Sequence, residues 1–419
     1  MPQLSIVIPA FNNSRYLPDC VHSVTHQHFR DVEVIIVDDC STDDTYEVAS
    51  QLEHEDSRVR LIQHDKNSGT LASRKTGVLA SQGQFVMLMD QDDELADGAL
   101  QKLIDFGNAN PADIYHFGVQ VVAANKSAQD AAAGMTSFLT PCARTLHDAD
   151  ILKAQFNTDN GFDWHVHHKM YRGDFARTAY SYAADQRLVL SDDLYMSFIF
   201  GTLASTYIGI PDSPWYLYHL GRGDTLGTQL TVQSISTMAQ RDAQAFSMVS
   251  DFAKRDNILP LRNDWHDRLD DVRNRLIEHA MNEWQDNLPS SDKSEGLQNI
   301  LTHWQADAVC GELYRYIRDY AYAYLVADNR SSDVAINNRK LANQYLQNVE
   351  LIESAHSLPQ HSTNQHYLDL RTIARQHLLD SGIINAETNQ DQSTRASRLK
   401  IYVEVSFFLL IRECLLVRL

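Results

Sequence analysis

Four carboxylates crowd into a short stretch of the chain, at Asp90, Asp92, Asp93 and Glu94, with Gln91 between the first two. Like charges this close repel one another and raise each other's pKa unless a cation or hydrogen bonds compensate. A divalent cation is a natural compensation, because Mg²⁺ commonly takes one or two protein carboxylates together with substrate phosphates. The cluster therefore predicts a site for a metal ion and a phosphorylated ligand. The alternative is a solvated acidic loop that caps the next helix.

Strands and helices are predicted to alternate through the first 120 residues. Short apolar runs that are typical of buried strands cover residues 4–8, 32–37, 59–62, 85–89 and 114–122. Apolar side chains recur at helical spacing in residues 17–24, 71–80 and 100–106. Ser41 and Asp44 resemble a capping box that opens a further helix. This alternation predicts an α/β fold with a mostly parallel sheet and helices on both faces.

Polar residues collect where the predicted strands end. Phe11-Asn12-Asn13 follows the first strand, Asp38-Asp39 ends the second, and the acidic cluster at 90–93 follows the fourth. In such sheets ligands bind beyond the carboxyl ends of the strands. Three separate stretches of sequence are therefore expected to converge on one edge of the sheet.

Composition and charge exclude several classes of protein. The formal net charge of -19 argues against nucleic acid as a partner, because binding to phosphates needs a basic surface. The five cysteines lie far apart and form no C-x-x-C pair, so no disulfide framework is expected. We find no secretory leader and no uncharged run of about 18 residues that could span a membrane. These features predict a cytoplasmic protein.

The N-terminal 120 residues contain four short motifs, and a family resemblance rests on their order and spacing. They are S-I-V-I-P-A-F-N at 5–12, V-D-D-C-S-T-D at 37–43, N-S-G at 67–69 with Arg74 and Gly77, and M-D-Q-D-D at 89–93. Together they resemble the family 2 glycosyltransferases, which are inverting enzymes with a GT-A fold. Cys40 replaces the Gly or Asn that the family commonly has in its D-D-x-S motif, and Lys75 stands where Asn often follows the Arg.

The resemblance implies a role for several residues at the nucleotide. Pro9, Phe11 and Asp39 would line the pocket for the base, and Asp39 would accept the N3–H of a uracil. The alternative for Asp39 is a cap at the start of a helix. Arg74 would lie near the nucleotide and its phosphates, and an ordinary surface ion pair is the alternative. The implied donor is a nucleotide-sugar of the UDP type.

The same resemblance implies a metal site that serves the diphosphate. Asp90 would face the ribose and the metal, and Asp92 would coordinate an Mn²⁺ or Mg²⁺ ion. Such an ion neutralises charge on the departing UDP. His219 lies in a Tyr-rich segment similar to a late motif of these enzymes and could be a third ligand, with a packed core histidine as the alternative. Arg222 could contact the diphosphate.

Inversion also needs a carboxylate that takes the proton of the acceptor hydroxyl. Asp193 lies where the family has the Asp of a Glu-Asp pair, so the resemblance assigns it as the general base, with Asp192 in place of the Glu. Both are also expected in the first turn of a helix over 194–200, whose dipole favours them there. Trp164 begins the segment W-H-V-H-H-K-M-Y at 164–171, which is similar to the family's W-x-x-K-L-Y element and is expected beside the acceptor.

Three histidines of that segment, His165, His167 and His168, raise the question of zinc. Adjacent histidines on a strand alternate between its faces, and no Cys or acid at a suitable spacing completes a site. We therefore expect no zinc at these residues.

The resemblance and the patterns predict two domains. Residues 1–227 would be the GT-A domain, with a nucleotide-binding half at 1–122 and an acceptor half at 161–227. Residues 123–160, rich in Ala, Ser, Asn and Asp, are expected to form an insertion or loop. From residue 228 to 419, Gly and Pro are scarce and apolar residues recur at helical spacing, which predicts a mainly α-helical domain for oligomerisation, acceptor binding or membrane association.

The final 25 residues, 395–419, carry five basic and two acidic side chains, and residues 401–419 are otherwise very apolar. A basic, amphipathic end could lie at an anionic membrane surface, at the inner face of the cell membrane. The alternative is a helix buried against the helical domain or against a second subunit of a homo-oligomer.

The leading hypothesis is an inverting, metal-assisted glycosyltransferase that acts on a glycan, lipid-linked or glycoprotein acceptor in polysaccharide biosynthesis. A sugar nucleotidyltransferase is a second hypothesis, but residues 9–13 do not form its Gly-rich, basic loop. A non-catalytic glycan-binding or scaffold protein is a third, and it predicts that Asp92 and Asp193 are dispensable.

Overall fold

The computed structural model describes residues 2–156, 161–188, 191–222 and 230–385. The chain divides into two compact units. The first comprises Met1–Gln229 with Gln240–Arg275, and the second comprises Leu230–Ala239 with Leu276–Leu419.

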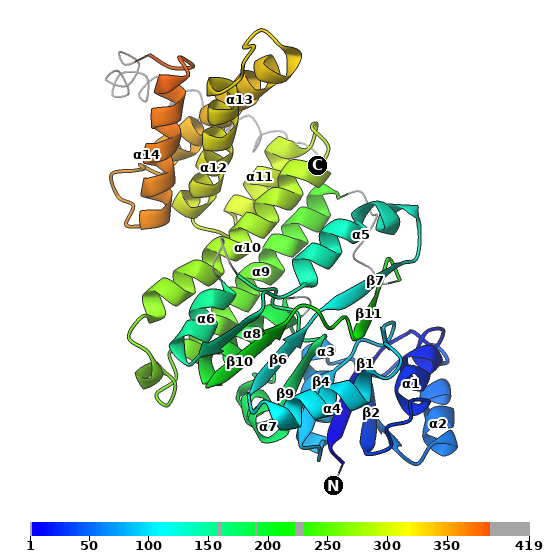
Figure 1. Ribbon diagram of the computed structural model, residues 1–419. Coiled ribbons are helices and arrows are strands. Elements are labelled where there is room, and N and C mark those ends of the chain that lie inside the picture. Colours follow the sequence, from blue (N-terminus) through cyan, green and yellow to red (C-terminus); the bar gives the residue numbers. More distant parts are fainter. Residues whose placement is uncertain (1, 157–160, 189–190, 223–229, 386–419) are drawn as a thin grey trace, which may run out of the picture. The chain divides into compact units, whose positions relative to one another are not determined.

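The first unit is built on two sheets, which use strands from the whole length of its main segment. In chain order these are β1 Leu4–Ala10, β2 Val32–Asp38, β3 Val59–Gln63, β4 Phe85–Leu88, β5 Glu94–Leu95, β6 Ile114–Phe117, β7 Val119–Ala123, β8 Arg144–His147, β9 Lys169–Arg172, β10 Thr206–Ile210 and β11 Tyr216–Leu220. The larger sheet has eight strands in the order β3-β2-β1-β4-β9-β6-β10-β8, and the smaller has the order β5-β11-β7 (Figure 1).

Most neighbouring strands of the larger sheet are parallel. β1 pairs in parallel with β2 and β4, β2 with β3, and β6 with β10. Two strands run the other way, because β9 is antiparallel between β4 and β6, and β8 is antiparallel to β10 at the edge. The predicted α/β fold with a mostly parallel sheet is confirmed.

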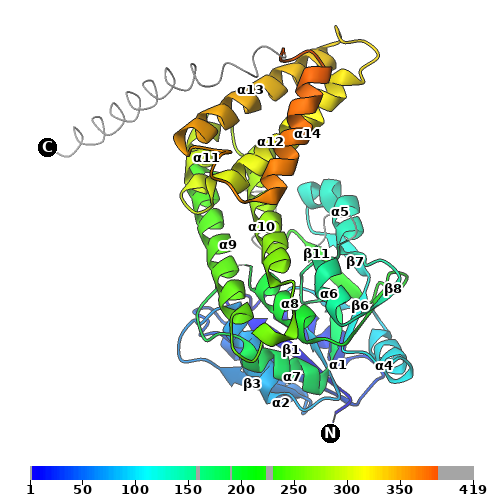
Figure 2. The same ribbon diagram turned by 90° about the vertical axis from the view of Figure 1, so that its left-hand side faces the viewer.

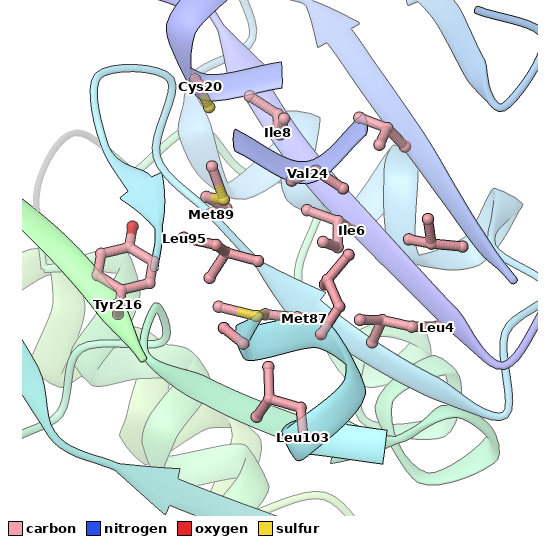
Figure 3. Packing of buried hydrophobic residues seen from close by; sticks show 14 of the residues in the cluster. Leu4, Ile6, Ile8, Cys20, Val24, Met87, Met89, Leu95, Leu103 and Tyr216 are labelled. Atoms are coloured by element: carbon pink, nitrogen blue, oxygen red, sulfur yellow. The ribbon is translucent and has the colours of Figure 1, made fainter. Parts of the chain in front are cut away.

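Eight helices of the first unit come from its main segment, and they cover both faces of the sheet. They are α1 Leu17–Thr25, α2 Thr45–Glu55, α3 Thr70–Ala80, α4 Ala99–Ala109, α5 Lys126–Leu139, α6 Ala149–Gln155, α7 Gly173–Tyr182 and α8 Asp192–Leu203. The even-numbered residues of β1 pack into a core with α1 and α4, where Ile6 and Ile8 lie near Met87, Val24 and Leu103 (Figure 3). The opposite face of β1 meets α3.

α3 approaches the sheet closely because Gly77 has no side chain. A Cβ at Gly77 would lie 2.3 Å from a methyl carbon of Val7 in β1 and 3.2 Å from one of Val37 in β2. Any larger residue there would push α3 away from the strands, and α3 carries Arg74.

The strand predicted over 114–122 is in fact two strands in two sheets. β6 joins the large sheet and β7 the small one, with Gly118 between them. A Cβ at Gly118 would lie 2.7 Å from the carbonyl oxygen of Pro211, so only glycine permits this close approach. The continuous apolar run hid the break, because Gly118 by itself is a weak signal inside a strand.

The prediction of an insertion or loop over 123–160 is wrong in its main part. Residues 126–139 form α5, residues 144–147 form β8, and residues 149–155 form α6. Asn125 caps α5 by accepting a hydrogen bond from the backbone N–H of Ala128 at 2.9 Å. Alanine, one of the residues on which the loop prediction rests, in fact favours helix.

The capping box predicted at Ser41 and Asp44 is also wrong. α2 begins at Thr45, its N-cap is Asp44, and no side chain caps it. The Oγ of Ser41 instead accepts a hydrogen bond from the backbone N–H of Asn12 at 3.1 Å. A polar residue near a helix start was therefore used to join two strand ends.

The second unit is helical throughout its described part, as predicted for this region. It contains α11 Lys293–Leu301, α12 Ala306–Leu325, α13 Asp333–Ala355 and α14 Gln365–Asp380, and α12 packs against α13 and α14 (Figure 2). The boundary between the units falls within α9 Val232–Ala253 and α10 Trp265–Asn287. Residues 395–419, predicted to contact a membrane or a second subunit, lie outside the described residues.

One buried carboxylate joins the helices of the second unit. Glu353 of α13 accepts hydrogen bonds from Tyr314 Oη of α12 at 2.9 Å, and from Tyr367 Oη and Arg371 Nε of α14 at 2.6 and 2.9 Å. Because Glu353 is only 5% exposed, these donors replace the water that it loses. Within the part of the chain that the structure describes, no helix is long and apolar enough to cross a membrane.

We predict that Glu353→Ala destabilises the second unit by about 2–4 kcal/mol, because two buried hydroxyls and a guanidinium lose their acceptor. Urea unfolding followed by circular dichroism measures the change. Gln347→Ala, at an exposed position of the same helix, is the control and should change stability by less than about 0.5 kcal/mol. Equal effects of the two substitutions would contradict the structural role of Glu353.

Candidate active site

The ends of β1, β2 and β4 meet through side chains that bond to neighbouring backbone. The side-chain amide of Gln91 bonds to both backbone groups of Phe11. Its Oε1 accepts from the N–H of Phe11 at 2.9 Å, and its Nε2 donates to the backbone oxygen of Phe11 at 3.1 Å. The backbone N–H of Asn12 donates to Ser41 Oγ, and Asn12 Oδ1 accepts from the N–H of Thr42 at 2.8 Å. The predicted convergence of these segments on one edge of the sheet is confirmed.

Arg74 of α3 connects the acidic cluster with the later acidic pair. Its Nη2 donates to Oδ1 of Asp90 at 2.7 Å, and its Nη1 donates to Oδ2 of Asp192 at 3.0 Å and also to Asp193. The guanidinium is 4% exposed. Burial alone would lower the pKa of Arg74, but the carboxylates outweigh it and raise that pKa well above its usual value. One cation thus faces three carboxylates, and negative charge remains in excess.

Asp192 and Asp193 lie in the first turn of α8, as predicted. The N-cap residue of this helix, Ser191, has a left-handed backbone with φ of 57° and makes no side-chain cap. Burial, then the neighbouring Asp193 and Asp90, raise the pKa of Asp192 to about 7 against the opposing effect of Arg74. Asp192 therefore titrates near neutral pH.

Asp93 is the most deeply buried acid of the first cluster, at 2% exposure. It accepts hydrogen bonds from Tyr216 Oη at 2.8 Å and from the backbone N–H of His219 at 2.7 Å. Tyr216 Oη in turn accepts from the backbone N–H of Asp90 at 3.2 Å. Burial, with the charges of Asp90 and Asp92, raises the pKa of Asp93 well above its usual value. Asp93 and Tyr216 hold the acidic loop against β11.

Two further residues predicted for this site, His219 for the metal and Arg222 for the diphosphate, lie against Glu94. Nε2 of His219 lies 2.9 Å from Oε1 of Glu94, and Nη1 of Arg222 lies 3.4 Å from the same oxygen and 3.2 Å from the backbone oxygen of Asp92. Burial and the nearby Arg222 lower the pKa of His219, which favours the neutral imidazole that a metal ligand needs. Asp90, Asp92 and His219 do not form a pre-assembled three-ligand group.

A Mg²⁺ or Mn²⁺ ion at this loop does not require such a group. Mg²⁺ takes one or two protein carboxylates and completes its shell with water and substrate phosphate. The Asp90 side chain is 31% exposed, and the four carboxylates of this loop outnumber the nearby guanidinium groups of Arg74 and Arg222. The donor set therefore fits a hard dication, and the assignment of Asp90, Asp92 and His219 stays a prediction.

Asp39 is bound into the loop that follows β3. Its Oδ1 accepts from His64 Nδ1 at 2.8 Å and from the N–H of Ser68 at 2.9 Å, and its Oδ2 accepts from the N–H of Gly69 at 2.7 Å. Because Oδ2 accepts one bond in the structure, it keeps capacity for a further donor. Nearby, the exposed Phe11 offers an aromatic ring, and Pro9 is the last but one residue of β1. Their contacts with a base stay predictions.

Trp164 lies partly buried in the segment before β9. Its backbone oxygen accepts from Ser197 Oγ of α8 at 2.6 Å, so this segment is tied to the helix that carries Asp193. The ring of His167 stacks on those of Tyr216 and Tyr218, with centroids 5.1 and 5.5 Å apart. The expected place of Trp164 beside an acceptor stays a prediction.

Comparison with known proteins found a family model that matches part of the chain. Residues 5–172 match the family model described as Glycosyl transferase family 2. Residues 5–172 are therefore similar to a family 2 glycosyltransferase domain. Six residues that follow β2 and β4 or belong to α3 and α8 are here called the strand-end site; they are Asp39, Arg74, Asp90, Asp92, Asp192 and Asp193.

Curated relatives of the glycosyltransferase domain come from bacteria. The chain is 34% identical over 116 residues to GalNAc(5)-diNAcBac-PP-undecaprenol beta-1,3-glucosyltransferase of Campylobacter jejuni, a match that covers 27% of this chain and 38% of that protein. It is 37% identical over 105 residues to the putative teichuronic acid biosynthesis glycosyltransferase TuaG of Bacillus subtilis, with 25% of this chain and 42% of that protein covered. The chain thus spans less than half the length of these relatives.

Solved structures agree with the fold. The crystal structure of S. aureus TarS 1-349 has a TM-score of 0.53 and 17% sequence identity, and covers 83% of this chain and 92% of that chain. The same protein in complex with UDP has a TM-score of 0.52 at 18% identity, with the same coverage. At this identity the likeness supports a GT-A fold, as predicted.

Sequence reasoning missed three residues of the glycosyltransferase domain and its continuation. Gln91 was given no role, yet it ties the acidic loop to β1 through both backbone groups of Phe11. Asp93 and Tyr216 form a buried pair that supports Asp90. A buried tyrosine far along the chain gives no local sign of its partner, whereas the position of Gln91 between two aspartates was a usable signal.

Cys40 shows why the glycosyltransferase family commonly has Gly or Asn at this position. Its backbone is left-handed, with φ of 61°, a conformation that Gly adopts freely and Asn tolerates. We predict that Cys40→Gly raises the free energy of unfolding by roughly 0.5–1 kcal/mol. Urea unfolding measures it, with Cys142→Gly at an exposed position as the control. A loss of stability in Cys40→Gly beyond that of the control would contradict the explanation.

The raised pKa of Asp192 predicts a pH-dependent stability. An acid whose pKa is higher in the folded state stabilises below its unfolded value, near 3.8, and that contribution is lost as pH rises through about 7. Asp192→Asn should therefore gain about 1–3 kcal/mol relative to the wild type between pH 5 and pH 8. The exposed Asp185→Asn serves as the control, and its difference from the wild type should stay constant over this range. A constant difference for Asp192→Asn as well would refute the raised pKa.

Proposed function

We propose that the protein is an inverting glycosyltransferase that moves a sugar from a nucleotide-sugar to a hydroxyl group of a glycan, lipid-linked or glycoprotein acceptor. The observation that carries this proposal is the contact of Arg74 with both Asp90 and Asp193. Through one side chain it joins Asp90, which would face the ribose and the metal, to the predicted general base. Such closeness is what a single displacement at an anomeric carbon requires.

The relatives support a donor and acceptor of this kind. The name of the Campylobacter protein specifies a sugar acceptor linked to undecaprenol, and TuaG is named for teichuronic acid biosynthesis. The structural relative has been solved with UDP. By analogy we infer a UDP-sugar as donor and a bacterial cell-envelope glycan as acceptor. A polyprenyl-linked acceptor would place the reaction at the cytoplasmic face of the membrane.

The proposed reaction transfers one proton to the protein and releases one leaving group. Asp193 takes the proton of the acceptor hydroxyl, whose oxygen then forms a bond to the anomeric carbon from the face opposite the diphosphate. The bond from that carbon to the phosphate oxygen breaks, and its electron pair leaves with UDP. A Mg²⁺ or Mn²⁺ ion held by Asp90 and Asp92 would supply charge neutralisation for the departing diphosphate. Arg74 keeps Asp193 in position throughout.

The position of Arg222 also fits a nucleotide-sugar donor. The guanidinium of Arg222 lies over the ring of Tyr16, 4.6 Å from its centroid, and beside the loop that carries Asp92. A guanidinium in this place can bind phosphate oxygens directly. Asp39, with its remaining acceptor capacity, suits the N3–H of uracil, and the exposed Phe11 suits a flat base. Specific donor recognition would therefore come from β1 and β2, while Asp193 acts from α8.

A donor screen tests the proposal, with release of free nucleotide measured for a panel of nucleotide-sugars in the presence of Mn²⁺. We predict that Asp193→Asn lowers kcat by about 10²–10⁴-fold, because the acceptor hydroxyl loses its base. Asp92→Ala should abolish the Mn²⁺ dependence together with most of the activity. The exposed acids Asp97 and Asp185 provide matched controls, and Asp97→Asn and Asp185→Asn should keep wild-type rates.

Other outcomes separate the alternatives. Unchanged turnover in Asp193→Asn would exclude it as the base while leaving the transferase function intact. Binding of UDP without turnover of any donor, and unaffected by Asp193→Asn, would indicate a glycan-binding or scaffold protein. Release of pyrophosphate from a nucleoside triphosphate and a sugar phosphate would indicate a nucleotidyltransferase.

A further inference from the structure

A second cluster of ionisable groups lies outside the strand-end site. His116 comes from β6, His168 immediately precedes β9, and Asp163 lies in the segment before it. All three are buried, with exposures of 0%, 0% and 3%. Among the residues that the structure describes, they alone form a group of three such side chains whose potential ligand atoms all lie within 4.8 Å of one another.

The three ligand atoms form a nearly equilateral triangle. Nε2 of His116 lies 2.9 Å from Nε2 of His168 and 3.0 Å from Oδ2 of Asp163, and the third side is 3.3 Å. A tetrahedral Zn²⁺ ion with bonds of about 2.0–2.1 Å holds its ligand atoms roughly 3.3 Å apart. The side chains thus already occupy three corners of such a tetrahedron, with little movement needed.

A second layer of hydrogen bonds orients each of these groups. Nδ1 of His116 lies 2.8 Å from Tyr207 Oη, and Nδ1 of His168 lies 2.7 Å from Nδ1 of His167. Metal binding needs the proton of each imidazole on Nδ1, so that both Nε2 atoms offer a lone pair to the ion. Metal-binding histidines are usually held in this tautomer by a second partner.

Asp163 is arranged in the same manner. Its Oδ2 faces the two histidines, while its Oδ1 accepts from Lys169 Nζ at 3.1 Å and from the N–H of His165 at 2.9 Å. The lysine therefore bonds to the oxygen that is turned away from the triangle. A carboxylate with one oxygen supported and the other free is a usual monodentate ligand.

Without a metal, the same atoms form a hydrogen-bonded cluster. The two Nε2 atoms lie 2.9 Å apart, so one imidazole carries its proton on Nε2 and the other accepts it through its lone pair. This arrangement competes with metal binding, and metal titration decides between the two. The backbone of His168 is also left-handed, with φ of 42°, and such a conformation is retained where the surroundings require it.

We propose that His116, Asp163 and His168 bind one transition-metal dication, for which Zn²⁺ is the best match by ligand type and spacing. The ion links β6 to the residues that precede β9, all within the first unit. A water molecule is its fourth ligand. It also fixes His168, whose neighbour His167 stacks on Tyr216 and so supports the loop of Asp90. Of the three histidines in the 164–171 segment only His168 takes part, and the other ligands are Asp163, just before that segment, and His116 of β6.

Metal titration of the full chain without nucleotide tests the proposal. Co²⁺ is the probe, because tetrahedral Co²⁺ absorbs visible light, and Zn²⁺ content after dialysis is counted by mass spectrometry. We expect about one tightly bound ion per chain. Asp163→Asn and His168→Gln should weaken binding at least about tenfold. Two control variants should retain the ion. They are His165→Gln, whose ring meets Oδ1 of Asp163 rather than Oδ2, and Asp92→Ala in the strand-end site.

Three results would overturn the proposal. One is a wild-type chain that takes up no Co²⁺ or Zn²⁺ with a tetrahedral spectrum. Another is an ion that remains in Asp163→Asn, and the third is an ion that is lost in Asp92→Ala alone. If the cluster variants do not fold, the wild-type spectrum decides, together with a rise in Tm on Zn²⁺ addition that a chelator reverses. None of these readouts uses a nucleotide-sugar, so the transferase proposal stands or fails separately.

Discussion

A single buried guanidinium holds the strand-end site together. Arg74 comes from α3, and its three carboxylate partners come from the loop after β4 and from the start of α8. The packing of α3 against β1 at Gly77 sets the reach of this side chain. Since one positive charge cannot balance three negative ones, the residual charge makes this edge receptive to a further cation. The residues proposed for the donor and for the acceptor meet at this one ionic contact.

Much of the fold could be predicted because buried parallel strands leave a strong signal. The apolar runs before Pro9, Asp38 and Asp90 are short and end in polar residues, so both the strands and their functional edge were visible. α8 was also expected, with Asp192 and Asp193 in its first turn. These features depend on local sequence alone. The identity of the residues at the strand-end site followed from the resemblance rather than from periodicity.

The remainder depends on contacts between distant residues. Gly118 divides β6 from β7 because of the carbonyl of Pro211, which no pattern near residue 118 reveals. Tyr216 and Asp93 are similarly separated in sequence, and so are His116 and Asp163. Local reasoning judged the three histidines near residue 168 only against their own neighbours. His116 lies far along the chain from that segment, so the ligand set that it completes is invisible to such reasoning.

The position of β9 has a consequence for how the chain can be made or divided. β9 fills the gap between β4 and β6, although it is synthesised after both. Until it arrives, β4 keeps an open edge and β6 has no neighbour in the sheet, because β10 is later still. The family match ends at residue 172, which is also the last residue of β9. A fragment cut at residue 122 would therefore expose unpaired strand edges to other chains and aggregate, so residues 1–122 are not a detachable unit of this protein.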